Sequence, residues 1–215
     1  MEYWEEKGKR RHPSHPVVNA YALPKLDFIQ SYIELKTKSV LDVGCGNGYF
    51  TYYFDRITDT IGLDASSNML GMNPCKKLVV GDASVLPFRD SSVGLVFCGN
   101  LLHHIETPDT VIKEMARVSN EYVVIVEPNR NNPLMALFAV LVKEERRTLK
   151  FTLGYIKQTA RAVGLSVIAS SSMGMIAPNK TPSFLLPILR KIDAQHPLGL
   201  ANIVICRKNK TDCNR

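Results

Sequence analysis

Short apolar runs alternate along the chain with longer segments in which apolar residues recur at helical spacing. The runs predict strands at residues 39–43, 60–64, 77–80, 93–98, 121–126, 165–169 and 202–206. The other segments predict helices at residues 23–35, 49–56, 67–73, 107–118, 133–150, 153–163 and 184–192. This alternation predicts an α/β fold with a doubly wound, mostly parallel sheet. With 215 residues the chain is expected to form a single domain, 1–215.

The first predicted strand ends in a glycine-rich turn. Gly44, Gly46 and Gly48 alternate with other residues directly after the apolar run that ends at Val43. Glycine adopts backbone angles that other residues avoid, and it lets the main chain approach a ligand closely. A strand, a glycine turn and a helix in this order form a nucleotide-type pocket at the carboxyl end of the strand.

Two details of this turn restrict the class of ligand that it could bind. Position 49 is Tyr, so the spacing is G-x-G-x-G and differs from the G-x-G-x-x-G fingerprint of dinucleotide sites. Asp42 lies just before the turn and would repel a bare pyrophosphate, whereas it would attract a cationic amine. Both details argue against a nicotinamide-dependent dehydrogenase.

Acidic residues also end the next two predicted strands. Asp64 lies 20 residues after Gly44, where a second strand can present a carboxylate to both hydroxyls of a ribose. Asp82 ends the third strand and could accept the exocyclic amine of an adenine. Because the carboxyl ends of parallel strands share one edge of the sheet, these acids predict a single site for an amine, a sugar and a purine.

Four segments carry a family resemblance: LDVGCGNG, GLDAS, GDASVLPF and VFCGNLLHHI. In this order, over about residues 39–129, the chain resembles the class I S-adenosylmethionine-dependent methyltransferases, nearest to the type 11 group that acts on small molecules. The resemblance implies a seven-stranded sheet of order 3-2-1-4-5-7-6 with an antiparallel last strand and helices on both faces. It also implies methyl transfer from S-adenosylmethionine to a small acceptor, for which an apolar character is expected. An N-terminal arm, 1–19, is expected to lack regular structure and either to fold over the pocket or a partner or to pack against the body of the domain. Insertions near 129–152 and 171–200 lie where such folds carry their substrate lids.

The resemblance also implies which residues bind the cofactor. Asp42 and the glycine turn would hold the methionine half, Asp64 the ribose, and Asp82 with Ala83 the adenine. The implied set is Asp42, Gly44, Cys45, Gly46, Gly48, Asp64, Ala65, Ser66, Asp82, Ala83, Asn100 and Leu101.

Residues for the methyl acceptor are less sharply defined. His103 and His104 follow the fourth strand at the same edge of the sheet and are either an acid/base pair or structural. Glu127 either contacts the acceptor or fixes its loop. The remaining candidates for the acceptor are Asn129, Tyr3 and His15. Met and Phe residues of the insertions, such as Met135 and Phe138, line an apolar acceptor cavity or belong to the ordinary core. No metal is expected, because adjacent histidines should point apart and no carboxylate triad accompanies them.

Charge and composition leave two further functions open. The net charge is +7, with basic clusters near both ends and at residues 143–150. Such clusters are ordinary solvated surface or attract nucleic acid, anionic lipid or an acidic substrate. A methyltransferase that acts on RNA or protein therefore remains an alternative. A second alternative, independent of the charge, is a non-catalytic module that binds S-adenosylmethionine.

The cysteines and the apolar runs indicate a compartment. Five cysteines without a C-x-x-C pair favour a reduced, cytoplasmic protein. The longest apolar run, residues 133–142, is about half as long as a membrane span. The sequence does not specify an oligomeric state.

Overall fold

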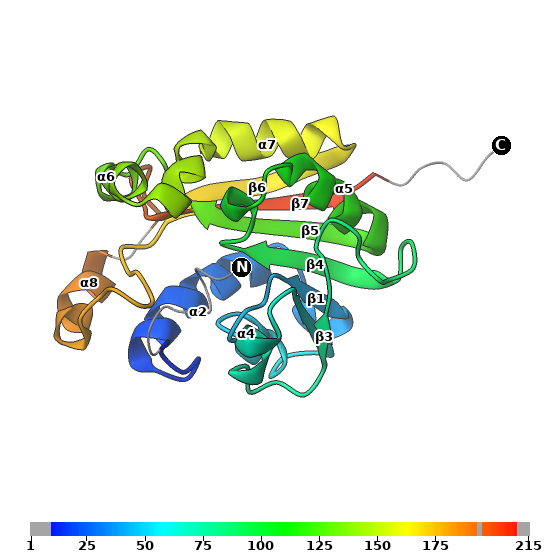
Figure 1. Cartoon of the computed structure of the whole chain (residues 1–215), viewed down its shortest axis with the longest axis horizontal. Coiled ribbons are helices and arrows are strands. Elements are labelled where there is room, and N and C mark those ends of the chain that lie inside the picture. The colour runs from blue at the N-terminus through cyan, green and yellow to red at the C-terminus, as the bar shows by residue number, and fades with distance from the viewer. Residues whose placement is uncertain (1–9, 193–194, 210–215) are drawn as a thin grey trace.

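A seven-stranded sheet in the order β3-β2-β1-β4-β5-β7-β6 forms the centre of the molecule (Figure 1). The computed structural model describes residues 10–192 and 195–209. The strands are β1 (Val40–Val43), β2 (Thr60–Asp64), β3 (Leu78–Val80), β4 (Val93–Gly99), β5 (Ser119–Pro128), β6 (Leu165–Met173) and β7 (Ala201–Lys208). The first five strands of this order pair in parallel: β3, β2, β1, β4 and β5. Strand β7 is antiparallel to both β5 and β6. The predicted fold class, strand order and antiparallel last strand are confirmed.

The register of the central strands brings their carboxyl ends to one level. Val43 at the end of β1 pairs with Leu63 of β2 and with Cys98 of β4. The glycine turn continues this pairing, since the Gly44 amide donates to the Leu63 carbonyl over 2.7 Å. The segments after β1, β2 and β4 therefore start from the same edge of the sheet.

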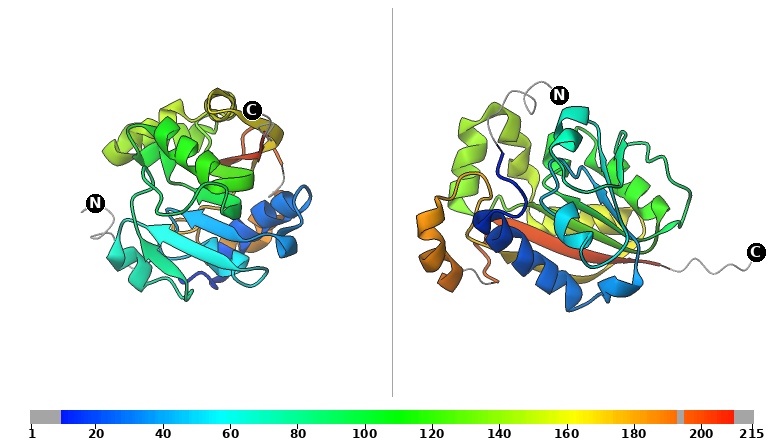
Figure 2. Two further views of the ribbon diagram at one scale, coloured as in Figure 1. Left: turned by 90° about the vertical axis from the view of Figure 1, so that its right-hand side faces the viewer. Right: turned by 90° about the horizontal axis from the view of Figure 1, so that it is seen from below.

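Helices cover both faces of the sheet (Figure 2). The α-helices are α2 (Pro16–Gln30), α3 (Thr51–Phe54), α4 (Ser67–Gly71), α5 (Pro108–Val118), α6 (Pro133–Leu141), α7 (Leu153–Ala162) and α8 (Leu186–Ile192). Short 3-10 helices are η1 (Leu35–Thr37), η2 (Leu102–His104), η3 (Lys143–Lys150) and η4 (Ser183–Leu185). Buried side chains of α2 and α3 share one apolar cluster, and those of α5 and α7 share a second cluster on the opposite face. Among the described residues no helix is both long and apolar enough to cross a bilayer.

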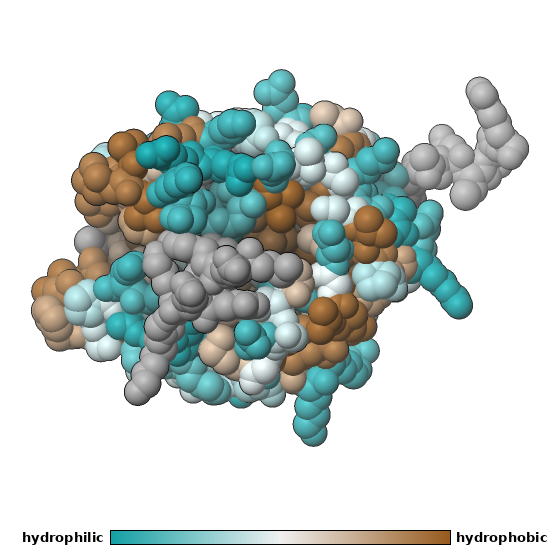
Figure 3. All heavy atoms as spheres, in the orientation of Figure 1, coloured by the Kyte–Doolittle hydropathy of each residue, from teal (hydrophilic) through white to brown (hydrophobic). Residues whose placement is uncertain are grey.

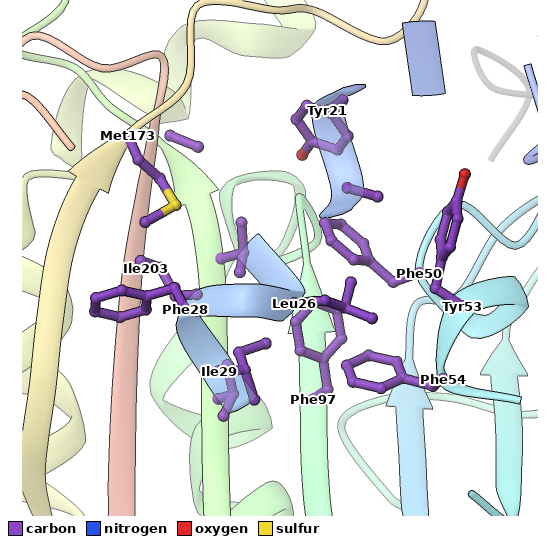
Figure 4. Close-up of a cluster of buried hydrophobic side chains, with 14 of the residues drawn as sticks. Tyr21, Leu26, Phe28, Ile29, Phe50, Tyr53, Phe54, Phe97, Met173 and Ile203 are labelled. Atoms are coloured by element: carbon purple, nitrogen blue, oxygen red, sulfur yellow. The ribbon is translucent and has the colours of Figure 1, made fainter. Parts of the chain in front are cut away.

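The cluster under α2 fixes the segment after the glycine turn (Figure 4). Phe97 of β4 packs between Phe50 and Phe54, with ring centroids 4.8 Å and 5.1 Å away. Leu26 and Ile29 of α2 cover these rings from outside the sheet. Aromatic pairs at such distances add to the burial energy of each ring. The turn is therefore anchored on a rigid aromatic base.

Several element boundaries differ from the sequence predictions. Helix α2 begins at Pro16, not at residue 23, so the end of the predicted irregular arm 1–19 is helical. The His15 Nδ1 atom accepts from the Val17 amide over 3.1 Å and caps this helix, and Pro16 suits its first turn. The helix predicted at 133–150 divides at Val142, whose backbone is extended. Strand β6 runs on to Met173 because β7 pairs with it up to Ala201.

Candidate functional site

A cavity of about 470 Å³ lies at the carboxyl ends of β1, β2 and β4. Helices α2 and α6 and the loop before η4 contribute its other walls. The lining residues are Arg10, Tyr21, Asp42, Gly44, Cys45, Gly46, Asn47, Tyr49, Phe50, Asp64, Ala65, Ser66, Met69, Gly99, Asn100, Leu101, His103, His104, Ile105, Pro128, Met135, Phe138, Glu145, Ile176, Ala177, Pro178, Asn179, Leu200 and Ala201. Nine of the twelve predicted cofactor residues are among them.

The glycine turn needs glycine for both conformation and space. Gly44, Gly46 and Gly48 have φ angles of 71°, 49° and 89°, a region that favours glycine. A Cβ atom on Gly44 would lie 2.7 Å from the Leu101 Cδ1 atom. The turn is therefore closely packed, and its backbone borders the cavity at Gly44 and Gly46.

Asp64 connects the turn to the second strand. One of its carboxylate oxygens accepts from the Gly46 amide over 2.8 Å, and the other accepts from the Ser66 amide over 2.9 Å. Each carboxylate oxygen can accept more than one hydrogen bond, so both keep capacity for a ligand hydroxyl. Asp64 can therefore hold the turn and a ribose at the same time.

Asp42 is a buried carboxylate at the cavity wall. The Thr51 hydroxyl donates to its Oδ2 atom over 2.7 Å. Burial raises the pKa of Asp42 to about 7, and the Thr51 hydrogen bond offsets only part of this effect. A bound ammonium would favour the ionised carboxylate and lower this pKa. The residue thus fits the cationic amine of S-adenosylmethionine.

The other three predicted cofactor residues do not line this cavity. Asp82 is exposed, and its Oδ1 atom accepts from the Ser84 amide over 2.7 Å. Ala83 is buried in the core cluster beneath α5. Gly48 packs against the Asn73 side chain, on the far side of the turn.

His103 lies between two carboxylates. Its Nδ1 atom is 2.6 Å from Glu127 Oε2, and its Nε2 atom is 3.4 Å from Glu145 Oε2. Burial alone would lower the pKa of His103, but Glu127 and then Glu145 outweigh it and raise the pKa to about 9. His103 is therefore a histidinium at neutral pH, and it links η2 to η3 of the first insertion.

His104 has the opposite character. Its ring centroid lies 3.7 Å from that of His103, so the two rings do not point apart as the sequence argument assumed. Burial, and then the charge of His103, lower the pKa of His104 to about 2. The ring lines the cavity as a neutral imidazole, which can exchange hydrogen bonds with a ligand but holds a proton poorly.

His103, His104 and Glu145 are the described residues that could hold a metal ion. One ligand atom from each lies within 4.8 Å of the others. The buried carboxylates of Glu127 and Glu145 are already balanced in part by the histidinium. A divalent ion would have to displace the proton of His103, because only neutral imidazole binds a metal.

The predicted acceptor residues have structural contacts instead. Glu127 is fully buried, and its Oε1 atom accepts from the Leu101 and Leu102 amides over 2.9 Å and 2.7 Å. Asn129 is fully buried and donates to the carbonyls of Pro197 and Gly199 over 3.0 Å and 2.9 Å. His15 caps α2, and Tyr3 lies outside the described residues. Neither Glu127 nor Asn129 reaches the cavity, so of the two roles proposed for Glu127 the structure favours fixing the loop.

Several residues that line the cavity were not predicted from the sequence. Tyr21 of α2 accepts a hydrogen bond from the Asn100 side chain over 2.7 Å, and burial raises the pKa of its hydroxyl. Asn100 itself has a φ angle of 55°, which turns the chain after β4 toward α2. Met69, Glu145 and Ile176 also line the cavity. None of them belongs to a motif, and only the packing of distant elements brings them together.

The second insertion is tied to the glycine turn. The Arg11 guanidinium donates to the carbonyls of Pro178 and Thr181 over 2.9 Å and 2.8 Å. The Tyr49 hydroxyl is hydrogen bonded to Asn179, and the Asn47 side chain donates to the Arg11 carbonyl over 3.1 Å. The loop at 176–179 is therefore held across the cavity by contacts with the turn and with the chain before α2.

Related sequences match only part of this chain. Residues 41–124 match the model of a family described as a methyltransferase domain. A demethylmenaquinone methyltransferase of Staphylococcus aureus is 32% identical over 114 residues, which cover 48% of this chain and 47% of that protein. A tRNA U34 carboxymethyltransferase of Nautilia profundicola is 28% identical over 112 residues, covering 42% and 34%. The matches thus span less than half the length of these relatives.

Solved structures match almost the whole chain in fold. A methyltransferase of Thermotoga maritima has a TM-score of 0.69 at 16% identity, covering 90% of this chain and 91% of that one. The magnesium protoporphyrin IX methyltransferase of Synechocystis, solved with bound S-adenosylhomocysteine, has a TM-score of 0.64 at 14% identity, covering 97% and 92%. Over residues 41–124 this chain is therefore similar in sequence to a methyltransferase domain, and over almost its whole length it is similar in fold to solved methyltransferases.

Proposed function

We propose that this protein transfers a methyl group from S-adenosylmethionine to a small, apolar acceptor. One observation carries the proposal. A single cavity joins the glycine turn and the acids of β1 and β2 to an apolar wall formed by the insertions. A cofactor and an acceptor bound in one cavity can be aligned and shielded from water together.

The polar end of the cavity supports binding of the cofactor. In our proposal Asp42 pairs with the amine of the methionine half, and Asp64 accepts the ribose hydroxyls. The backbone of Gly44 and Gly46 borders the cavity, and glycine lets the main chain approach a ligand closely. We keep Asp82 and Ala83 as candidates for the adenine, although they lie outside the cavity.

The opposite end supports an apolar acceptor. Met135 and Phe138 of α6 and Ile176 of the second insertion present apolar side chains to the cavity. Two relatives are named for small molecules, demethylmenaquinone and magnesium protoporphyrin. This wall has one aromatic ring, that of Phe138, and is poorly suited to RNA, which single-strand binding proteins hold by stacking on successive aromatic rings within a basic groove.

Positioning is the main task of the protein in this reaction. S-adenosylmethionine supplies a methyl group that a sulfonium already activates, so alignment accounts for most of the required rate. In our proposal the neutral His104 orients the acceptor by a hydrogen bond. The histidinium of His103 joins η2 to Glu127 of β5 and to Glu145 of η3. We further propose that the two insertions act as lids which exclude water.

Two binding and turnover measurements test the proposal. Calorimetry should detect one binding site for S-adenosylmethionine, and for S-adenosylhomocysteine, per chain. A screen of cell extract with isotopically labelled cofactor, read by mass spectrometry, should then show label in a small apolar metabolite. Label found only in RNA or protein would refute the acceptor class, and cofactor binding without any labelled product would favour a non-catalytic module. From the cysteine pattern alone we expect the protein in the cytoplasm.

A further inference from the structure

Helix α6 has no polar side chain, yet much of it faces solvent. Its sequence is PLMALFAVL, and Leu134, Leu137 and Leu141 are 66%, 56% and 74% exposed. A helix that is apolar on all sides is normally buried, whereas a surface helix carries polar residues on its outer face. The inner face of α6 already lines the cavity, through Met135 and Phe138. Its outer face therefore requires an additional apolar environment.

A second exposed apolar group lies at the same end of the molecule. Phe184 of η4 and Ile188 of α8 are 78% and 63% exposed. Figures 1 and 2 show α6 and α8 at one end of the sheet, and Figure 3 shows apolar surface over both. The two regions are linked, since Asn132 before α6 donates to the Leu198 carbonyl over 2.5 Å and Lys180 lies 5.9 Å from the Phe138 ring centroid. We call this surface the apolar rim; it consists of Leu134, Leu137, Val140, Leu141, Phe184 and Ile188.

Most of the excess positive charge of the chain accompanies the apolar rim. Residues 130–150 and 178–191 contain eight Lys and Arg but only two Glu, whereas the remainder of the chain has 19 basic and 18 acidic residues. Of the two Glu, Glu145 is engaged with His103. Arg146, Lys150 and Arg190 are exposed beside the apolar helices. Any partner of this end of the molecule should therefore be apolar and negatively charged at once.

We propose that the apolar rim docks on the surface of a membrane that contains anionic lipids. Interfacial helices combine aliphatic or aromatic side chains that enter the acyl region with basic side chains that meet the headgroups. A protein partner fits less well, because the hot spots of protein interfaces are enriched in Trp, Tyr and Arg, whereas five of the six side chains of the rim are aliphatic. RNA fits less well still, because Phe184 is the one side chain of the rim that offers a stacking surface to bases.

Docking in this orientation would place the cavity next to the bilayer. Helix α6 would form the wall between the two, with Met135 and Phe138 on the cavity side and Leu137 and Leu141 on the outer side. An acceptor dissolved in the membrane could then enter without crossing water. This consequence rests on the proposed function, whereas the docking does not.

Co-flotation with lipid vesicles tests the docking. The full chain should float with phosphatidylcholine vesicles that contain one-third phosphatidylglycerol, and far less with phosphatidylcholine alone. The double variant Leu137→Glu/Leu141→Glu should lose at least about tenfold in vesicle partitioning, because each Leu no longer enters the apolar layer. Arg146→Gln and Arg190→Gln should each lose about fivefold, and added salt should mimic them. As a matched control, Ile168→Glu on the exposed face of β6 should float like the unaltered protein.

Three further measurements show whether the double variant is folded and whether a second copy of the chain or RNA occupies the rim. Calorimetry with S-adenosylhomocysteine should give the same affinity for the double variant as for the unaltered protein, which shows that the variant is folded and separates this test from that of the proposed function. Absence of flotation with anionic vesicles, or equal flotation of the double variant, would overturn the proposal. Light scattering that shows a dimer which only the double variant dissociates would assign the rim to a second copy of the chain. Binding of RNA that the double variant loses would assign it to nucleic acid, and either result would also overturn the proposal.

Discussion

Asp42 offers the sharpest test of the cofactor site, because it should cost stability when the ligand is absent. Its carboxylate is buried against the cavity, and Thr51 is its one side-chain donor in the described structure. We expect Asp42→Asn to stabilise the ligand-free protein near pH 8 and to abolish binding of S-adenosylmethionine. Asn keeps the shape and the Thr51 hydrogen bond but carries no charge.

The magnitude follows from the pKa of Asp42. Burial raises the pKa from 3.8 to about 7 in the folded protein. Because the folded-state value is the higher one, the carboxyl has no destabilising effect below the unfolded pKa, and the free energy of unfolding falls as pH rises toward about 7. A difference of about three pH units corresponds to about 4 kcal/mol at most. The unpaired NH₂ group of Asn costs about 1–3 kcal/mol, which leaves a net gain of about 1–3 kcal/mol for the variant.

Thermal unfolding measures this gain. For a chain of this length, 1 kcal/mol shifts Tm by about 2–4 °C, so the variant should melt about 2–12 °C higher near pH 8. The advantage should shrink by about 2 kcal/mol near pH 5.5, where Asp42 of the unaltered protein is protonated. S-adenosylmethionine at 100 times its Kd should add about 2.7 kcal/mol to the unaltered protein and nothing to the variant.

A matched control and a clear failure condition complete this experiment. Asp27 is an exposed acid on α2, so Asp27→Asn should change neither the melting temperature nor the ligand effect. If Asp42→Asn were less stable than the unaltered protein near pH 8, or if its advantage did not depend on pH, the burial argument would be wrong. If it still bound the cofactor tightly, the proposed role of Asp42 would be wrong.

Four further predictions concern the same cavity. Asp64→Ala should weaken binding of S-adenosylmethionine by about 1–3 kcal/mol in calorimetry, because ribose hydroxyls lose their acceptor. His104→Ala should lower turnover more than cofactor affinity, and the rate profile of the unaltered enzyme should show no titration of His104 near pH 6.5, since its pKa is lowered to about 2. Glu127→Gln should destabilise the fold by about 3–5 kcal/mol, because one partner of a buried ion pair is removed. The pKa of His103 is raised from 6.5 to about 9, so the unaltered protein should lose stability as pH rises through this range, and Glu127→Gln should lose that dependence. A chelator should leave turnover unchanged, since the proton of His103 occupies the only described metal-binding cluster.

Each of these predictions has an outcome that contradicts it. Unchanged affinity of Asp64→Ala would remove the ribose contact, and full turnover of His104→Ala would remove its role toward the acceptor. A stable Glu127→Gln protein with the original pH dependence would show that Glu127 does not stabilise a charged His103. Inactivation by the chelator, reversed by a divalent ion, would show that the histidine cluster holds a metal after all.

The sequence by itself determined the sheet and the polar end of the cavity. Both follow from local patterns: apolar runs specify buried strands, and glycines at alternate positions specify a turn with positive φ angles. Strand polarity then fixes that Asp42 and Asp64 end at the same edge, whatever the rest of the chain does. Asp82 follows the same pattern, but it comes after β3, the outermost strand of this half of the sheet, and it lies outside the cavity.

Only the tertiary structure decided the environments of the remaining residues. His103 and His104 are neighbours in sequence, yet one is a cation and the other is neutral, because His103 forms ion pairs with Glu127 of β5 and Glu145 of η3 and its charge then opposes protonation of His104. The Glu127 side chain accepts hydrogen bonds from the amides of Leu101 and Leu102, although a carboxylate at the end of a strand could equally contact a ligand. Local sequence patterns determine the path of the backbone. The charge, burial and pKa of a side chain depend instead on contacts between segments far apart in the chain.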